Sequence, residues 1–183
     1  MRILERKFIL KNSKDVILRS PEISDAEEML DYLYKSAGET NNLSRYPEEI
    51  NTNLEDEKIY ISKQFESEKS FDIAAFIDGR LIGISTVFEF GHKVKTGHRA
   101  GYGISILKEY WNMGIGTMLT EYCLEIAKEI GYEQIELSVV EDNKGAIYIY
   151  EKSGFKLCGT IENAEKLKDG SYQNLQMMVC KLR

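Results

Sequence analysis

The chain has 183 residues, of which 43% are hydrophobic and 30% charged, and its net charge is −6. This length and composition are typical of one globular domain. The acidic excess argues against nucleic acid and anionic membrane as main partners, because both select basic surfaces. No apolar run reaches the ~18 residues of a membrane span, and the charged N-terminus is unlike a signal peptide. We therefore expect a cytoplasmic protein that binds neither nucleic acid nor membrane.

Two further features of composition bear on function. The three cysteines stand far apart without CxxC spacing, so neither a metal site nor a disulfide framework is expected. Residues 20–69 hold thirteen acidic and five basic residues. Such a segment indicates either solvated helix faces or a negative field that steers a cationic substrate, and both interpretations stay open.

The N-terminal third predicts a hairpin and two helices. Arg6–Leu10 and Asp15–Arg19 flank a polar turn, as two hairpin strands do. A first helix is expected over Pro21–Leu33 with Ser24 as its N-cap, and a second near Pro47–Glu66. The stretch Ala37–Tyr46 between them is polar and reads as a loop.

The middle of the chain predicts three strands. Phe71–Ile77 and Arg80–Phe90 are rich in β-branched and aromatic residues, and Asp78-Gly79 between them signals a tight hairpin. A further strand is expected over His98–Ile106.

The last third alternates helices and strands. Apolar residues recur at helical spacing from Ile115 to Ile130, where Gly131 ends the helix. The remaining expected elements are the strand Ile135–Val140, a helix from Asn143 or Lys144 to Ser153, and the strands Phe155–Ala164 and Tyr172–Leu182. Hairpins beside strand–helix–strand units predict an α/β (α+β mixed) fold. We expect a mostly antiparallel sheet of six to seven strands with helices on both faces, in one domain with its core over about 15–182.

A glycine-rich turn precedes the first of these C-terminal helices. Asn112-Met-Gly114-Ile-Gly116-Thr117 places two glycines where the helix begins, and unpaired amides there suit an anion such as a pyrophosphate. A P-loop would require lysine after Gly116, and a dinucleotide fingerprint would require glycine or alanine where Leu119 stands. Neither pattern is met.

A second motif follows about thirty residues later. Asn143, Ala146, Tyr150 and Gly154-Phe155 stand in the pattern Asn-x-x-Ala-x-x-x-Tyr-x-x-x-Gly-Phe. Together with the glycine turn, this pattern resembles the GNAT superfamily of acyl-CoA-dependent N-acetyltransferases over residues 101–155. One position departs from the family pattern, because Trp111 stands where glutamine or arginine is usual and cannot donate to a phosphate as arginine does.

The resemblance implies a cofactor site for acetyl-CoA, a co-substrate, and no metal. It implies that pantetheine lies along a splayed strand, that amides of the glycine turn bind the pyrophosphate, and that Asn143 binds the pantetheine arm. The cofactor-binding residues expected on this basis are Ile104, Ser105, Ile106, Trp111, Asn112, Met113, Gly114, Ile115, Gly116, Thr117, Asn143 and Tyr150.

The catalytic groups are assigned from the chemistry of acyl transfer. Tyr150 is the candidate general acid, because a phenol is protonated at neutral pH and hydrogen-bonds the leaving thiolate. Glu89 and His98 are candidates for the base that deprotonates the amine, and a water relay is an equal alternative.

The acceptor site is expected in the loop between the first two helices, which the family uses with the final strands. There we expect Glu39 or Glu48 to hold a cationic group and Tyr46 to form a wall, although a solvated loop fits the same residues.

The favoured function is transfer of acetyl to a primary amine of a small molecule, by direct attack in a ternary complex. A protein N-terminal or lysine acetyltransferase and a non-catalytic acyl-CoA-binding module remain alternatives. A homodimer also stays open.

Overall fold

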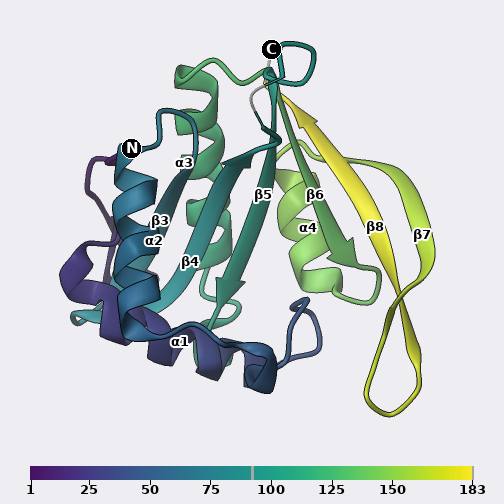
Figure 1. Cartoon of the computed structure of the whole chain (residues 1–183), viewed down its shortest axis with the longest axis horizontal. Coiled ribbons are helices and arrows are strands. Elements are labelled where there is room, and N and C mark those ends of the chain that lie inside the picture. The colour runs from purple at the N-terminus through teal and green to yellow at the C-terminus, as the bar shows by residue number, and fades with distance from the viewer. Residues whose placement is uncertain (92, 183) are drawn as a thin grey trace.

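The computed structural model describes residues 1–91 and 93–182 of the chain. Its strands form one sheet in the order β1-β2-β3-β4-β5-β6-β8-β7 (Figure 1). The strands are β1 (Arg6–Ile9), β2 (Asp15–Arg19), β3 (Phe71–Ile77), β4 (Arg80–Glu89), β5 (Arg99–Ile106), β6 (Gln134–Val140), β7 (Lys156–Lys166) and β8 (Tyr172–Lys181). Neighbouring strands are antiparallel except β5 and β6, which are parallel. The predicted mixed, mostly antiparallel fold is confirmed. The sheet of the described residues has eight strands instead of the expected six to seven, because the N-terminal hairpin also joins it through β2 and β3.

Helices cover both faces of this sheet (Figure 1). They are α1 (Ala26–Gly38), α2 (Leu54–Glu66), α3 (Ile115–Glu129) and α4 (Lys144–Lys152), with short 3₁₀ turns at Ile23–Asp25, Pro47–Glu49 and Lys108–Tyr110. The larger core lies on the α3/α4 face and includes Leu119, Tyr122 and Tyr150. The smaller core lies on the α1/α2 face and includes Met29, Ile61 and Leu107.

The first two helices begin later than the sequence predicts. Ser24 lies in a 3₁₀ turn, and α1 starts after Asp25, whose carboxylate accepts from the Glu22 amide at 2.7 Å. In the second case Asn53 caps α2 by accepting from the amides of Glu55 and Asp56, so Pro47–Glu49 forms a separate turn. Both corrections involve short polar side chains that hydrogen-bond the backbone: Asp25 holds the 3₁₀ turn before α1, and Asn53 caps α2 itself.

Alternation along the strands assigns side chains to the two faces. On β5, Tyr102, Ile104 and Ile106 pack with the α3/α4 core. Ser105 points the other way, and its hydroxyl lies 2.7 Å from that of Tyr32 on α1. The two faces of β5 therefore offer different chemistry: apolar and aromatic toward α3/α4, glycine and hydroxyl toward α1/α2.

None of the helices in the described part of the chain is long and apolar enough to cross a membrane.

Candidate active site

The parallel strands β5 and β6 separate partway along their length. They pair only over three residues, from Arg99 opposite Gln134 to Gly101 opposite Glu136. β5 then continues to Ile106, still paired with β4 on its other side, while β6 continues along β8. Backbone groups of residues 102–106 that face β6 are thus left without a strand partner, and an extended ligand can bind them as a missing strand would.

The turn after β5 supplies a second set of unpaired backbone groups. Gly114, in the left-handed region at φ 86°, precedes α3 without any side chain capping the helix. Among the described residues, the backbone amides of residues 112–117 donate no hydrogen bond. Free amides at the positive end of a fifteen-residue helix form a site for a phosphate group.

Close packing explains why the second glycine of this turn, Gly116, has no side chain. A Cβ on Gly116 would lie 2.9 Å from Cδ1 of Ile149 on α4 and 3.5 Å from Cδ1 of Ile106 on β5. Gly116 therefore brings the start of α3 against both α4 and the free end of β5. The two unpaired backbone regions are held next to each other by this contact.

Trp111, the residue that departs from the family pattern, has a structural partner. Its indole Nε1 donates to the Ile106 carbonyl oxygen at 2.7 Å. The side chain fixes the end of β5 to the glycine turn instead of reaching for a phosphate. A phosphate at this turn would therefore be bound by backbone amides.

Tyr150 on α4 lies against the strand where the separation begins. Its ring packs edge-on to Tyr102 with centroids 6.3 Å apart, and it is 6% exposed. Burial raises the pKa of its phenol, so the hydroxyl stays protonated at neutral pH. No hydrogen bond to this hydroxyl is found within the described residues. Asn143 caps α4 through its Oδ1, which accepts from the Ala146 amide at 3.2 Å.

The loop after α1 contacts the free end of β5 and the tip of the last hairpin. Glu39 accepts a hydrogen bond from the Lys108 amide at 2.7 Å, just beyond β5. Glu48 forms an ion pair with Lys168, whose ammonium also lies 4.0 Å from the centre of the Tyr46 ring. Of the predicted acceptor residues, Glu39 thus lies at the end of β5, Tyr46 and Glu48 lie against the tip of the last hairpin, and each carboxylate already has a partner.

The two predicted base candidates lie at the opposite end of the sheet. Glu89 is paired in register with Ala100, and the His98 carbonyl accepts from the Glu133 amide at the start of β6. Because a strand rises ~3.4 Å per residue, Ala100 is about 20 Å from Ile106. The structure does not bring Glu89 or His98 together with Tyr150 and the separated strands, since both precede the point where β5 leaves β6.

A polar row on the α1/α2 face was not anticipated. Register places Asp72 on β3, Thr86 on β4 and Gly103 on β5 side by side across the sheet. Thr86 donates to Asp72 Oδ1 at 2.6 Å. The signal was present in the sequence, because Asp72 is the one charged residue within the otherwise apolar strand Phe71–Ile77.

Comparisons with known proteins agree with this geometry. Residues 29–155 match the model of the acetyltransferase (GNAT) family, so the chain belongs to that family of acetyl-CoA-dependent acyltransferases. It is 30% identical over 107 residues to L-amino acid N-acetyltransferase AaaT of Escherichia coli, a match that covers 58% of this chain and 65% of that one. It is 26% identical over 148 residues to an N-alpha-acetyltransferase of Sulfurisphaera tokodaii, covering 80% and 83%.

Solved structures show the same fold. A GNAT acetyltransferase from Streptococcus pneumoniae superposes with a TM-score of 0.87 at 28% identity, covering 91% of this chain and 99% of that one. The yncA protein of Salmonella typhimurium, determined with its cofactor acetyl-CoA, superposes with a TM-score of 0.80 at 11% identity, covering 92% and 94%. The predicted resemblance to the GNAT superfamily is confirmed.

Proposed function

We propose that the chain transfers the acetyl group of acetyl-CoA to a primary amine of a small molecule, by direct attack within a ternary complex. The observation that carries the proposal is the separation of β5 from β6 directly before a helix start with unpaired amides. One region suits an extended amide-bearing arm and the next suits a pyrophosphate, and acetyl-CoA contains both groups in that order.

On this proposal the backbone along Ile104 to Ile106 binds the pantetheine arm, with Asn143 beside it on α4. Amides of residues 112–117 bind the pyrophosphate. Ser105 keeps β5 in place, since its backbone groups face β4 and its hydroxyl lies against that of Tyr32. Trp111 sets the shape of the turn, since its indole is bound to the Ile106 carbonyl.

Tyr150 is proposed as the general acid. When the amine attacks the thioester carbon, the C–N bond forms and the C–S bond breaks, leaving a thiolate that requires a proton. A buried phenol that stays protonated and has no protein partner for its hydroxyl is suited to donate it.

The acceptor is proposed to enter beside the loop after α1. That loop is tied to the last hairpin by Glu48–Lys168 and by Gln173, which donates to the Asn41 carbonyl at 2.9 Å. Such closure favours a small amine over a folded protein. The relative AaaT acts on L-amino acids by its name, which supports the same choice, while the Sulfurisphaera relative keeps a protein N-terminus as the second candidate.

The test is acceptor-dependent release of free CoA thiol from acetyl-CoA. Pools of amino acids, polyamines, aminoglycosides and short peptides are each compared with a control lacking acceptor. We expect release with a small-molecule pool and a loss of ~100-fold or more in kcat for Tyr150→Phe. Tyr148→Phe is the matched control, because Tyr148 is two residues away on the same helix and 67% exposed. Release with peptides alone would contradict the small-molecule assignment.

The same assay distinguishes a binding module from an enzyme. Saturable acetyl-CoA binding without thiol release in any pool would favour a non-catalytic acyl-CoA-binding protein. Absence of both binding and release would overturn the proposal.

A further inference from the structure

A buried carboxyl lies next to the separated strands and has no part in the scheme above. Asp72 is 2% exposed, and its Oδ1 accepts from the Thr86 hydroxyl at 2.6 Å. The Tyr60 hydroxyl on α2 also lies near it. A charged group placed in an apolar strand is costly to bury, so its presence calls for a reason beyond packing.

The position of Thr86 connects this carboxyl to the site. Thr86 is opposite Gly103 on β5, two residues beyond Gly101, where pairing with β6 ends. Gly103 is exposed, and a Cβ built on it would meet nothing within 4 Å. Two strand spacings separate Asp72 from Gly103, about 10 Å, and the Thr86 side chain stands between them. A hydroxyl thus leads from open space at the strand separation to a buried carboxylate.

A second acid lies near the first. Glu57, on the turn of α2 before Tyr60, is 3% exposed, and its carboxylate forms no hydrogen bond within the described residues. Burial, and next the Asp72 charge, raise the pKa of the Glu57 carboxyl, against the opposing charge of Arg45. Two acids thus lie close together on this face, and negative charge there suits an ammonium group.

We propose that Asp72, acting through the Thr86 hydroxyl, accepts the proton that the acceptor amine loses, and that Glu57 attracts the ammonium form of that amine. This assignment rests on the proposed acetyl transfer and offers a base joined to the strand separation by a hydrogen bond, whereas Glu89 and His98 lie at the paired end of β5.

The proton balance is complete without another reactant. The ammonium gives one proton to Thr86 Oγ1, directly or through water, while the hydroxyl proton moves to Asp72 Oδ1. The neutral amine forms the C–N bond and the C–S bond breaks. Tyr150 protonates the thiolate, and the second nitrogen proton passes through water to the Tyr150 oxygen and restores the phenol. Asp72 then releases its proton to solvent, so the reaction yields amide, CoA thiol and one proton.

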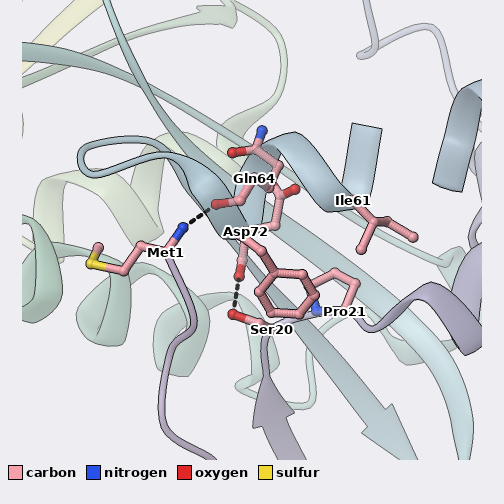
Figure 2. Close-up of a pocket in the computed structure, with 7 residues that line it drawn as sticks. Met1, Ser20, Pro21, Ile61, Gln64 and Asp72 are labelled. Atoms are coloured by element: carbon pink, nitrogen blue, oxygen red, sulfur yellow. Dashed lines mark hydrogen bonds between the residues drawn. The ribbon is translucent and has the colours of Figure 1, made fainter. Parts of the chain in front are cut away.

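The groups around Asp72 determine how the reaction responds to pH. Tyr60 and Glu57 face it from α2 and Thr86 from β4. Figure 2 shows its other side, where Ser20 Oγ donates to its backbone carbonyl at 3.4 Å and the Met1 amino group donates to the Gln64 carbonyl. Burial is the largest influence and raises the pKa of the Asp72 carboxyl, against the hydrogen bond from Thr86, the nearby Tyr60 hydroxyl and the nearby Met1 charge. The base form is therefore lost as pH falls through this raised pKa, and kcat falls with it.

The experiment compares steady-state kinetics of Asp72→Asn, Thr86→Val and Thr86→Ser with an amine found in the pooled assay. We expect kcat to fall ~100-fold for Asp72→Asn and ~10-fold or more for Thr86→Val, and Thr86→Ser to retain activity within ~3-fold. The acid limb of the kcat profile should move to higher pH in Asp72→Asn. For Glu57→Gln we expect a rise in acceptor KM of ~10-fold with little change in kcat.

Two controls separate a proton-transfer role from a structural one. Asp78→Asn changes an exposed acid at the β3–β4 turn and should keep wild-type rates. Acetyl-CoA affinity, measured by calorimetry, should be unchanged in every variant, because the cofactor groups lie on other elements.

Each remaining outcome counts against the proposal. Unchanged kcat and pH profile in both Asp72→Asn and Thr86→Val would overturn it while leaving acetyl transfer intact. Equal losses in Thr86→Val and Thr86→Ser would show that the hydroxyl is not the connecting group. A wild-type chain that transfers acetyl to no amine would overturn the proposed function and this assignment with it.

Discussion

The two ends of β5 differ in what their backbone does. At the end near Arg99, three residues pair with β6, and the Arg99 guanidinium binds both oxygens of Glu136 across the two strands. At the end near Ile106, the same strand has no partner on that side. The difference indicates that the first end holds the sheet together and the second is kept open for a ligand. Substitutions at the paired end should alter stability, and those at the open end should alter binding and rate.

The largest expected effect is at the start of α3. Thr117→Asp places a carboxylate among the amides proposed to bind the pyrophosphate. We expect acetyl-CoA to bind at least ~10-fold more weakly, about 1.4 kcal/mol, because two negative groups compete for the same amides. The melting temperature should stay equal or rise, because an acid in the first turn stabilises a helix. Thr160→Asp, at an exposed position on β7, is the control for added charge. Unchanged affinity measured by calorimetry would place the pyrophosphate elsewhere.

A smaller effect is expected where the loop meets the hairpin. Glu48→Gln removes the ion pair with Lys168, and Glu39→Gln weakens the contact with the Lys108 amide. We expect acceptor KM to rise ~3- to 5-fold in each, with acetyl-CoA affinity unchanged, because exposed ion pairs contribute little energy. Glu68→Gln, exposed after α2, is the control. If neither variant alters acceptor KM, the loop does not border the acceptor site.

The pH dependence of stability should have opposite signs at two acids. Arg99 holds the pKa of the Glu136 carboxyl below its ordinary value, so Glu136 stabilises the fold above that value and this contribution is lost as pH falls through the lowered pKa. We expect Glu136→Gln to destabilise by ~1 kcal/mol at neutral pH and less in acid. Burial raises the pKa of Asp72, so its ionisation lowers stability as pH rises from the ordinary toward the raised value.

Asp72→Asn should therefore gain stability relative to wild type as pH rises over that range. Denaturant unfolding of both variants between pH 4 and 8 measures the two trends. If the stability of both variants relative to wild type changed with pH in the same direction, the pKa values of Glu136 and Asp72 would not be shifted in opposite directions.

The smallest effect is expected for the two acid–base candidates at the paired end. Glu89→Gln and His98→Gln should leave kcat/KM within ~2-fold of wild type, because Glu89 lies about 10 Å along β4 from Thr86 and His98 about 17 Å along the chain from Gly103. Steady-state rates with the identified amine measure this. A loss of ~100-fold in either variant would mean that the chemistry takes place near the paired end.

Local patterns predicted much of the fold and the two motifs on which the proposed cofactor site depends. The motif from Asn143 to Phe155 and the glycine turn are each a short continuous stretch of sequence. Both could therefore be recognised without knowing the tertiary structure. Gly114 is an example: the turn requires a left-handed backbone at this position, and glycine adopts it without strain, so the residue type alone indicates the turn.

Tertiary pairings could not be predicted in the same way. The partners of Glu48 and Glu39 are 120 and 69 residues away, and no local pattern links them. The contact between Asp72 and Thr86 depends on strand register across a bulge between Ala75 and Phe76. Trp111 departs from the family pattern at the glycine turn, and the sequence offers no reason for it. The structure does, because β5 ends where the indole can donate to the Ile106 carbonyl.

The most direct test of the account is a crystal structure with a bisubstrate ligand, in which CoA is joined through an acetyl linker to the amine found by the assay. The account predicts pantetheine along residues 102–106, the pyrophosphate on the amides of residues 112–117, and the amine on the α1/α2 face beside Thr86. A ligand whose amine lies on the α3/α4 face, or whose pyrophosphate does not contact the start of α3, would contradict it.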